Sequence, residues 1–515
     1  MNPLVEYPAD AVARYRAVWG SRSIPAEFRA VAARHPDRDA VVALDGRLTY
    51  AELDARSDRV AAGLLALGLE PGGPVLFQVT NRLEAVVAWY AVLKAGLVPV
   101  ATLAAHRGHE IGEISRRVGA VAHLVEPGLT FDLVAFAREQ AVGRLLVLGE
   151  LPEADPGPLP EADPGAVGVY QLSGGTTGVP KVIPRRHAEY WYNAAEYARS
   201  WGWTADTRVA HLIPIIHNAG VVCAVHAPHS VGACLVLGTP DLDESLPLLA
   251  REAATHVLLG HGHYRALDHP EFDAAAKTLT QVILSGAKVP PRLFDALESR
   301  GIWSGQLFGM GEGLFLTTRP GAPRAARLET VGTPLSRWDE VRILEPGSEE
   351  PADGVGELCC RGPYTLPGYY DAPEHNARAF TGDGFYRTGD LAAWREIDGE
   401  RFVSIEGRIK DLINRGGEKI NAEEVELLLL RHPRVTAVAV VAMPDPRLGE
   451  RTCAYVVVDG AELTLDEVQR HFAALDVAKF KWPERIEHLP EIPRTLVGKT
   501  DKKALAADIA RKVAT

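Results

Sequence analysis

A glycine-rich segment and a distant lysine are the features of this sequence that most directly suggest chemistry. Residues 173–181 read Ser-Gly-Gly-Thr-Thr-Gly-Val-Pro-Lys, and Lys499 lies far along the chain in Arg-Thr-Leu-Val-Gly-Lys-Thr. Glycine lets the backbone approach an anion closely, while hydroxyl and ammonium groups bind phosphate oxygens. The candidate phosphate-binding residues are Ser173, Gly174, Gly175, Thr176, Thr177, Gly178 and Lys181. A site divided between distant segments closes only when two domains meet, so the sequence predicts an enzyme that binds a nucleoside triphosphate and changes conformation.

The spacing of these residues disfavours a Walker A loop, which needs Gly-x-x-x-x-Gly-Lys-Ser/Thr. Two residues separate Gly178 from Lys181, so the motif fails there. Residues 498–500 imitate its end, but Pro493 occupies the place of its first glycine. A P-loop kinase or GTPase is therefore not expected. For the segment 173–181 taken alone, an ordinary surface turn stays the alternative, because such turns are also rich in Gly, Ser and Thr.

The first half of the chain alternates helical and strand patterns, which is typical of βαβ units. Thr49 and Glu52 have the spacing of a capping box, so we expect a helix to begin there. Buried strands are expected at the short apolar runs 75–79, 145–148 and 234–237. The acidic, proline-rich stretch 150–165 is expected to be a surface linker, after which 167–172 enters the phosphate loop as a strand.

From about residue 330 the chain becomes rich in glycine and turns, which indicates β structure. A smaller α+β unit is expected after 407–411. Its predicted elements are a helix from about 422, strands near 437–443 and 453–458, and a helix capped by Thr464 and Glu467.

The predicted fold class is therefore α/β. A large N-terminal domain, 1–409, is expected to consist of βαβ layers plus a small β-barrel-like subdomain. A small, mobile α+β domain is expected at 410–515.

Composition disfavours several classes of function. The chain has 515 residues, 47% of them hydrophobic, which is enough to bury several cores. A formal net charge of −12 argues against a general binder of nucleic acid or of an anionic membrane. Neither end shows a targeting pattern. The most apolar stretch, 84–105, is broken by Lys94 and Pro99, so a buried helix–strand pair is expected there instead of a membrane span.

Cysteine and histidine patterns do not predict a metal centre or disulfides. The five cysteines form no Cys-x-x-Cys pair, which predicts buried free thiols in a cytoplasmic protein. His226 with His229, and His261 with His263, have a spacing that metal ligands adopt. No second cluster is visible to complete either site, so no structural metal is expected.

Six ordered motifs together resemble the adenylate-forming superfamily, which includes acyl-CoA synthetases, luciferases and the adenylation domains of peptide synthetases. They lie at 173–181, 309–313, 386–390, 407–411, 415–419 and 493–499, and the resemblance covers nearly the whole chain. The particular residues at several motif positions are similar to those of free-standing aryl-acid–AMP ligases of the salicylate and 2,3-dihydroxybenzoate type. The segments that carry this finer resemblance are 171–178 with 183–185, 217–218, 361–365, 368–370 with 374–376, and 415–424.

The resemblance implies a reaction in two halves that uses ATP and Mg²⁺. An aromatic carboxylate attacks the α-phosphorus of ATP, giving aryl-AMP and pyrophosphate, and a thiol then displaces AMP. The chain contains no carrier-protein serine motif, so the expected acceptor is the phosphopantetheine thiol of a separate aryl carrier protein in siderophore or nonribosomal peptide biosynthesis. An aryl-CoA ligase that uses free coenzyme A is the alternative. A catalytically inactive nucleotide-binding protein is a second one, against which Lys499, Glu312 and Asp390 argue.

The resemblance also assigns roles to single residues. Lys499 would bridge the carboxylate and the α-phosphate as charge builds, because both reactants are anions; a solvated lysine is the alternative, and it suits Lys503 better. Glu312 would bind Mg²⁺ through a hard carboxylate oxygen. Asp390 would accept both ribose hydroxyls, with Arg408 as a second ribose contact. The backbone that would frame adenine and the aryl ring lies at Gly286, Ala287, Lys288, Gly309, Met310 and Gly311.

Lys410 matches the hinge position of the superfamily. The resemblance implies a large rotation of 411–515 between the two half-reactions, which removes Lys499 from the site. The same rotation would present a thioester-step loop that contains Gly416, Gly417 and Lys419.

The aryl-acid pocket is where the sequence departs from the family pattern. Asn218, after His217, matches the residue expected to hydrogen-bond an ortho hydroxyl or amino group; a structurally satisfied turn residue is the alternative. Cys223 stands where dihydroxybenzoate enzymes carry serine, which disfavours 2,3-dihydroxybenzoate. The positions that are smaller than expected are Ala219, Gly260 with His261, and Gly311. Together they predict a pocket roomier than salicylate needs, which would admit a ring-substituted salicylate or anthranilate or a bicyclic quinaldate-like acid as well as salicylate. Gly286 is also expected to line this pocket.

Overall fold

The computed structural model describes residues 3–173, 180–285, 289–415, 418–475, 477, 479–495 and 499–514. The chain divides into two compact units. Unit 1 comprises Met1–Glu340, Cys360–Tyr386 and Ile397–Phe402, and unit 2 comprises Val341–Cys359, Arg387–Glu396 and Val403–Thr515. Unit 2 thus includes Val341–Cys359, Arg387–Glu396 and the first residues of Val403–Thr515, all of which precede the predicted boundary at 409/410, and that boundary stays a prediction.

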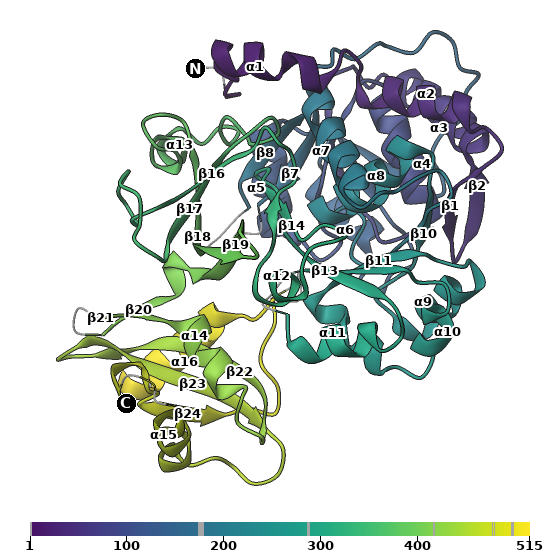
Figure 1. The fold of residues 1–515 in the computed structure, drawn as a ribbon. Coiled ribbons are helices and arrows are strands. Elements are labelled where there is room, and N and C mark those ends of the chain that lie inside the picture. The colour runs from purple at the N-terminus through teal and green to yellow at the C-terminus, as the bar shows by residue number, and fades with distance from the viewer. Residues whose placement is uncertain are drawn as a thin grey trace. The chain divides into compact units, whose positions relative to one another are not determined.

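In the described part of unit 1, a nine-stranded sheet has the order β15-β14-β13-β12-β11-β9-β10-β1-β2 (Figure 1). Its strands are β1 (Asp39–Ala43), β2 (Gly46–Thr49), β9 (Arg208–His211), β10 (Cys234–Leu237), β11 (His256–Gly260), β12 (Gln281–Ser285), β13 (Trp303–Gly309), β14 (Phe315–Thr317) and β15 (Thr333–Pro334). The six central strands β13, β12, β11, β9, β10 and β1 pair parallel with one another. At the two ends of the order, β2 pairs antiparallel with β1, β14 with β13 and β15 with β14.

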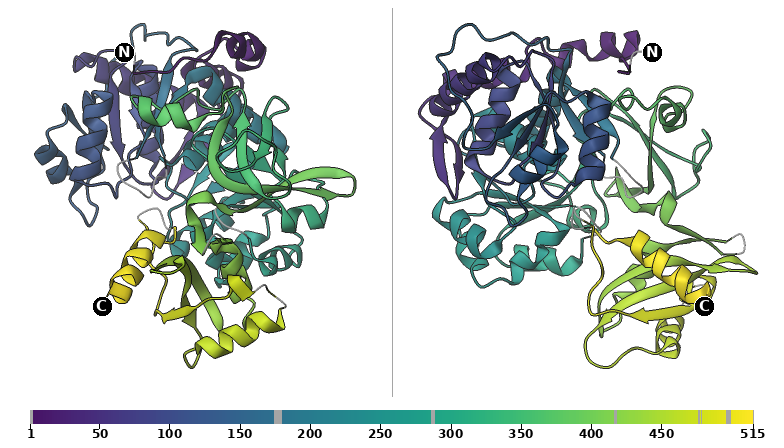
Figure 2. Two further views of the ribbon diagram at one scale, coloured as in Figure 1. Left: turned by 90° about the vertical axis from the view of Figure 1, so that its left-hand side faces the viewer. Right: turned by 180° about the vertical axis from the view of Figure 1, so that it is seen from behind.

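The second sheet of unit 1 has, among the described residues, six strands in the order β6-β5-β3-β4-β7-β8. Its strands are β3 (Pro74–Gln78), β4 (Val98–Val100), β5 (Ala122–Val125), β6 (Arg144–Val147), β7 (Val167–Leu172) and β8 (Val182–Arg186). A parallel sheet needs cover on both faces, and helices of unit 1 supply it (Figures 1 and 2). The α-helices described in unit 1 are α1 (Ala9–Trp19), α2 (Ile24–Arg34), α3 (Tyr50–Ala66), α4 (Leu83–Lys94), α5 (Gly108–Val118), α6 (Leu133–Gln140), α7 (His187–Ser200), α8 (Ala227–Val231), α9 (Leu242–Arg251), α10 (Phe272–Ala276), α11 (Pro291–Glu298), α12 (Arg324–Glu329) and α13 (Pro373–Ala379).

Alternate residues of the strands pack into different cores, which arranges unit 1 in layers. The largest core joins helices α3, α4 and α7 to one face of each sheet, through residues such as Val41 and Phe77. The neighbouring Val42 packs instead with α9, α10 and α11 on the other face of the nine-stranded sheet. Leu76 packs with α5 and α6 on the other face of the six-stranded sheet. The order is therefore helix, sheet, helix, sheet, helix, as the βαβ patterns predicted.

Several local predictions are confirmed. Thr49 and Glu52 form both hydrogen bonds of a capping box at the start of α3. The expected strands are present as β3, β6, β7 and β10. The stretch 84–105 forms helix α4 and strand β4. All five cysteines are described, and each is a buried thiol outside any disulfide. Among the described residues, no helix combines the length and apolar character that a bilayer span requires.

The turn-rich segment forms a four-stranded sheet with the order β16-β17-β18-β19. Its strands are β16 (Glu340–Leu344), β17 (Gly356–Arg361), β18 (Tyr386–Ile397) and β19 (Glu400–Arg408). This sheet occupies the place of the predicted barrel-like subdomain.

The rest of unit 2 is an α+β structure. Its described sheet has the order β21-β20-β23-β22, with β24 beside β23. The elements are β20 (Leu412–Arg415), β21 (Glu418–Asn421), β22 (Val435–Asp445), β23 (Gly449–Val458), β24 (Arg485–His488), α14 (Ala422–Leu429), α15 (Leu465–Ala474) and α16 (Lys502–Ala514). Thr464 and Glu467 cap α15 as predicted. Two small cores form between the sheet and these helices, one of them containing Val425 and Phe472 and the other Tyr455 and Ile509.

A buried carboxyl group in unit 1 couples stability to pH. Asp339 accepts hydrogen bonds on Oδ2 from the Tyr364 hydroxyl and from the Ser336 N–H, the latter at 3.1 Å. Its buried Oδ1 has no partner among the described residues. Burial raises the pKa of Asp339 to about 8, and the two hydrogen bonds only partly oppose this effect. The folded protein therefore holds a proton that the unfolded chain releases near pH 4.

Replacing Asp339 by asparagine is expected to change how stability depends on pH. Between about pH 4 and pH 8 only the folded state binds this proton, so the free energy of unfolding falls as pH rises, by up to about 1.4 kcal/mol per pH unit. Asp339→Asn removes that titration, so Tm of the variant minus Tm of the parent should rise steadily from pH 4 to pH 8. Thermal unfolding at several pH values measures it, with the exposed Asp155→Asn as control. A difference that does not vary with pH would contradict the assignment.

Candidate nucleotide and acid site

The carboxyl ends of four parallel strands meet at one edge of the nine-stranded sheet. In the ladder, His211 of β9 pairs with Leu258 of β11, and Gly260 pairs with Ser285 of β12. Ser285 in turn pairs with Leu307 of β13. The segments that leave this edge hold the residues predicted to frame the aryl acid and adenine, and crevices beyond the carboxyl ends of such strands are the usual ligand sites of open α/β sheets.

The base of the glycine-rich loop is closed by two hydrogen bonds. The Ser173 N–H donates to the Lys181 carbonyl oxygen at 2.9 Å, and the Lys181 N–H donates to Ser173 Oγ at 3.0 Å. Ser173 follows β7 directly and is 8% exposed. The predicted phosphate-binding residues Gly174, Gly175, Thr176, Thr177 and Gly178 lie outside the described residues. The described part of the loop thus brings its first and last members together.

Lys181, Tyr369 and Glu312 form a compact polar cluster. The Lys181 Nζ lies 4.8 Å from the centre of the Tyr369 ring. The Tyr369 hydroxyl donates to Glu312 Oε1 at 2.7 Å and also lies 2.7 Å from the Tyr386 hydroxyl. Burial lowers the pKa of Lys181, and the Glu312 carboxylate acts in the opposite direction. The predicted phosphate-binding lysine and the predicted Mg²⁺ ligand therefore share one aromatic side chain.

The Glu312 carboxylate fits a Mg²⁺ ligand of the kind that phosphate enzymes use. Mg²⁺ in such sites takes one or two carboxylates and completes its shell with water and phosphate oxygens. No group of three or more His, Cys, Asp or Glu side chains that could hold a metal occurs within the described ranges. Glu312 lies in the turn between β13 and β14, and its backbone carbonyl is fixed by the Leu366 N–H at 2.9 Å. A single anchored carboxylate matches a metal that is held largely by its nucleotide.

Asn218 lies in a hydrogen-bonded chain of buried polar groups. Gln171 Nε2 donates to the Tyr190 hydroxyl at 3.0 Å, and that hydroxyl donates to Asn218 Oδ1 at 2.9 Å. Asn218 Nδ2 reaches the Met310 carbonyl oxygen at 3.4 Å. The side chain of Asn218 thus links the segment after β9 to the segment after β13, and both were predicted to face the acid or the nucleotide.

A buried ion pair supports the same region. The Arg185 guanidinium binds the Glu189 carboxylate through two hydrogen bonds, at 3.0 and 2.8 Å. Its Nη1 also donates to the Gly311 carbonyl oxygen at 2.9 Å, and its charge lies 4.3 Å from the centre of the Tyr190 ring. One fully buried arginine therefore positions both the backbone after β13 and the tyrosine that contacts Asn218.

Cys223 lies in a π-helix, η1 (Gly220–His226), which follows the His217–Asn218 segment. A Cβ on Gly220 would lie only 2.3 Å from the Ile215 carbonyl oxygen, so only glycine fits where this helix begins. Burial raises the pKa of the Cys223 thiol. A neutral thiol is a weak hydrogen-bonding partner, which agrees with the prediction against a 3-hydroxyl group.

The small residues of the predicted pocket have close neighbours. A Cβ on Gly311 would lie 3.0 Å from Ile183 Cδ1, and a Cβ on Gly260 would lie 3.3 Å from Ile213 Cδ1. Ends of isoleucine side chains therefore border the space that these glycines open. Ala219 packs at the edge of the largest core, its N–H 3.3 Å from His217 Nδ1. The side chain of His261 and the residues Gly286, Ala287 and Lys288 lie outside the described part of the structure.

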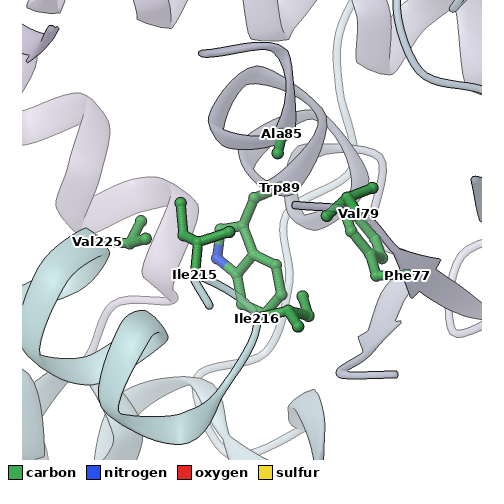
Figure 3. Close-up of a pocket in the computed structure, with 7 residues that line it drawn as sticks. All are labelled: Phe77, Val79, Ala85, Trp89, Ile215, Ile216 and Val225. Atoms are coloured by element: carbon green, nitrogen blue, oxygen red, sulfur yellow. The ribbon is translucent and has the colours of Figure 1, made fainter. Parts of the chain in front are cut away.

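An apolar cavity beneath this region is too small for an aromatic acid (Figure 3). Its volume is about 10 Å³, room for about one water molecule. It is lined by Phe77, Val79, Ala85, Trp89, Ile215, Ile216 and Val225. The polar atom in its wall, the Trp89 N–H, donates to His226 Nε2 at 3.0 Å. The cavity is therefore a packing gap in the core.

Unit 2 carries the remaining predicted residues. Arg408 Nε lies 2.9 Å from Asp390 Oδ1, so the structure brings the two predicted ribose contacts together. Asp390 follows Gly389, whose φ of 73° favours glycine. The Asp390 N–H donates to Thr388 Oγ1 at 3.0 Å. Lys410 lies in a short 3₁₀ turn, Ile409–Asp411. Its pKa is lowered mainly by burial and, to a smaller extent, by the neighbouring positive charge of Arg408.

Lys499 is exposed in a short turn near the start of α16. The Thr495 N–H donates to its carbonyl oxygen at 2.7 Å, and Arg494 forms a β-bridge with Thr500. Gly416, Gly417 and the side chain of Lys419, predicted for the thioester step, lie outside the described residues.

The supporting roles of Tyr369, Tyr190, Gln171 and Arg185 were not predicted. Three of them lie inside motifs, but a motif does not say which side chains are tied together. The signal for Arg185 was local, because Glu189 stands four residues away, in the first turn of α7. The Glu189 carboxylate also accepts from the Arg186 N–H at 2.8 Å. Tyr190 had no such signal, since its partners are distant in the sequence.

Comparisons with known proteins agree with this geometry. Residues 28–370 match the family model of the AMP-binding enzymes, and residues 424–499 match that of the AMP-binding enzyme C-terminal domain. The chain is 39% identical to a salicylyl-CoA synthase / salicylate adenylyltransferase of Streptomyces sp, over 98% of this chain and 97% of that protein. It is 37% identical to a salicyl-AMP ligase / salicyl-S-ArCP synthetase of Mycobacterium tuberculosis, over 99% and 95%.

Among solved structures, the chain is similar to MbtA of Mycobacterium smegmatis in its apo form, with a TM-score of 0.74 and 37% identity over 98% of each chain. The match of more than half the chain to one family model, together with relatives of this identity and coverage, shows the family. The chain belongs to the AMP-binding enzymes, the adenylate-forming superfamily that its motifs resemble.

Proposed function

We propose that the protein activates an aromatic carboxylic acid with ATP, giving aryl-AMP and pyrophosphate, and then transfers the aryl group to the phosphopantetheine thiol of a separate aryl carrier protein. The observation that carries the aromatic-acid assignment is the buried amide of Asn218, which lies 3.4 Å from the Met310 carbonyl. The amide joins the segment proposed to bind the acid to the segment proposed to bind the nucleotide, which supports a role in holding a polar group of the acid. The names of the two relatives, both of which act on salicylate, support the same reading.

The residues of unit 1 would hold the triphosphate during the first half-reaction. Lys181 and the loop closed by Ser173 would bind phosphate oxygens, and Glu312 would hold Mg²⁺, which supplies charge neutralisation when it is bound. Tyr369 keeps the Glu312 carboxylate in one orientation at 2.7 Å. Neutralising the negative charge of the phosphates in this way would let two anionic reactants approach each other.

The residues of unit 2 would complete the reaction. Asp390 and Arg408 would bind the ribose, exchanging part of their ion pair for contacts with its hydroxyls. Lys499 would neutralise the carboxylate and α-phosphate as they react. Lys410 would act as the hinge between domains 1–409 and 410–515, and the Gly416, Gly417 and Lys419 loop would serve the thioester step.

The experiment that tests this proposal is pyrophosphate exchange into ATP with a panel of acids. Salicylate, picolinate or quinaldate is expected to support exchange at least about tenfold faster than aliphatic acids and amino acids, because a site that hydrogen-bonds an ortho group of an aromatic acid rejects acids that leave its partner unpaired. A clear preference for an aliphatic acid or an amino acid would overturn the proposal.

The acceptor is tested separately, because the relatives' names include both a CoA synthase and a carrier-protein synthetase. Aryl transfer is measured to a phosphopantetheinylated aryl carrier protein and to free coenzyme A at equal concentration. Faster transfer to the carrier protein supports the proposed acceptor, and faster transfer to coenzyme A supports the aryl-CoA ligase.

A further inference from the structure

The turn that carries Lys499 is joined directly to the start of helix α16. The Asp501 N–H donates to the Pro493 carbonyl oxygen at 2.8 Å, and Asp501 Oδ1 accepts from the Ala504 N–H at 3.0 Å. Asp501 thus closes the turn and also caps the helix, which begins at Lys502. These hydrogen bonds leave little freedom between Lys499 and Lys502. The orientation of the first turn of α16 therefore determines where Lys499 lies within unit 2.

The first turn of α16 is held to helix α14 by an ion pair. Lys502 Nζ lies 2.7 Å from Glu426 Oε1, and the two side chains are only 22% and 16% exposed. The same Oε1 accepts from the Val440 N–H of β22 at 2.7 Å, so the sheet holds the carboxylate in one position. A charge-assisted hydrogen bond to a fixed acceptor is short and depends on geometry. Lys502 therefore binds an anchor that does not move within unit 2.

The middle of α16 is anchored by other contacts. Leu505 and Ile509 pack into the small core that contains Tyr455. The Tyr455 hydroxyl donates to Asp508 Oδ2 at 2.7 Å. These contacts do not depend on the ion pair, whereas the end of a helix frays easily when its side chains are released. Loss of the ion pair is therefore expected to loosen the first turn of α16 and to leave the fold of unit 2 intact.

The ion pair also lies near the proposed hinge. The pKa of Lys410 is lowered mainly by burial, and the positive charge of Lys502 adds to this effect. In the proposed rotation of 411–515, Glu426, Lys502 and Lys499 would all move together. A moving domain delivers a side chain accurately only if that side chain is fixed within the domain. The ion pair is placed to provide this fixation.

We infer that Glu426 and Lys502 are positioning residues for Lys499: their ion pair fixes the first turn of α16, and through it the turn that presents Lys499 to the acid and the α-phosphate. The inference rests on the proposed function and deepens it, because it names a contact within unit 2 on which the first half-reaction depends. Neither residue is expected to contact a substrate.

The test measures both half-reactions in Glu426→Gln and in Lys502→Ala. Pyrophosphate exchange with the aromatic acid that the parent prefers should slow by about tenfold in kcat, because even a shift of about 1 Å in a catalytic group is costly. KM for ATP and for the acid should change less than about threefold. Transfer from preformed aryl-AMP to the thiol should stay within about twofold of the parent rate, since Lys499 is proposed to act only in the first half-reaction.

Three further variants serve as controls. Glu424→Gln makes the same change on the same helix, where Glu424 binds Lys481 at 2.7 Å. Lys503→Ala removes the neighbouring exposed lysine of α16. Both should keep the parent rate of exchange. Lys502→Arg should keep at least about a third of that rate, because a guanidinium can bind the same carboxylate.

A double variant separates positioning from direct participation. If Lys502 acts only through Lys499, Lys499→Ala/Lys502→Ala should exchange no more slowly than Lys499→Ala, because the effects of residues that act as a unit do not add. A further tenfold loss in the double variant would show that Lys502 acts independently, and the inference would be wrong. If Lys502→Ala is insoluble, Glu426→Gln takes its place in both comparisons, because glutamine keeps an oxygen that can accept the Val440 N–H.

Failure of the inference can be distinguished from failure of the proposed function. If Lys499→Ala slows exchange while Glu426→Gln and Lys502→Ala do not, or if these two variants slow both half-reactions equally, the inference is wrong and the proposed function stands. If Lys499→Ala exchanges at the parent rate, the proposed role of Lys499 fails and the inference fails with it. If the parent activates no aromatic acid, the proposed function itself fails.

Discussion

Replacing Lys499 by alanine is expected to slow aryl-AMP formation by about 100- to 1000-fold, the loss typical of removing one group that stabilises developing charge. Both reactants are anions, and Lys499 is the residue of unit 2 proposed to neutralise them as they meet. The loss should lie in kcat for pyrophosphate exchange, with a smaller change in KM for either substrate, because the contact forms mainly in the transition state.

The second half-reaction gives the sharpest control for Lys499. Supplied with preformed aryl-AMP, Lys499→Ala should transfer the aryl group to the thiol at nearly the parent rate, because the lysine is proposed to have left the site by then. Lys503→Ala removes a nearby exposed lysine of α16 and should leave both half-reactions unchanged. Equal loss of both half-reactions in Lys499→Ala would contradict its proposed role.

Replacing Glu312 by glutamine is expected to reduce kcat/KM for ATP by about 100-fold and to raise the Mg²⁺ concentration needed for half-maximal rate. A neutral amide is a poor ligand for a hard divalent cation, yet its oxygen can still accept the Tyr369 hydroxyl, which now donates to Glu312 at 2.7 Å. The fold should therefore survive. Pyrophosphate exchange as a function of Mg²⁺ concentration measures the effect, and parent-like activity at ordinary Mg²⁺ would rule out the metal role.

The pH dependence of activity in Glu312→Gln tests separately the effect of the Glu312 charge on Lys181. The Glu312 carboxylate opposes the burial that lowers the pKa of Lys181. Without it, that pKa should fall further, and the lysine should lose its charge at a lower pH. The alkaline limb of the activity profile should therefore move toward lower pH. Tyr369→Phe keeps the carboxylate charge and should leave this limb closer to that of the parent.

Much of the fold could be predicted because its signals are local. The cap at Thr49 and Glu52 uses residues three apart, and the apolar runs of β3 and β10 are continuous. The π-helix around Cys223 was not predicted. It depends on the close approach of Gly220 to Ile215, which no periodicity reveals.

The candidate site was predictable as residue types and much less as contacts. Glu312 and Lys181 could be named from motifs, but the Tyr369 hydroxyl and ring that join them come from a third segment. The Tyr190 hydroxyl donates to Asn218 Oδ1 at 2.9 Å, and a sequence does not specify which partner of such a pair donates. Long-range partners of this kind are chosen by packing, so they require coordinates.

Three separated stretches of the chain build unit 2, and this sets a limit on exchanging its parts between relatives. If residues 410–515 were replaced by those of a relative, Val341–Cys359 and Arg387–Glu396 would still come from the recipient protein. Unit 2 of the chimera would then contain contacts between segments of two different proteins. Asp390 and Arg408 would both stay behind, while Lys499 would travel with the donor. Successful chimeras should therefore carry the inner stretches together with the tail.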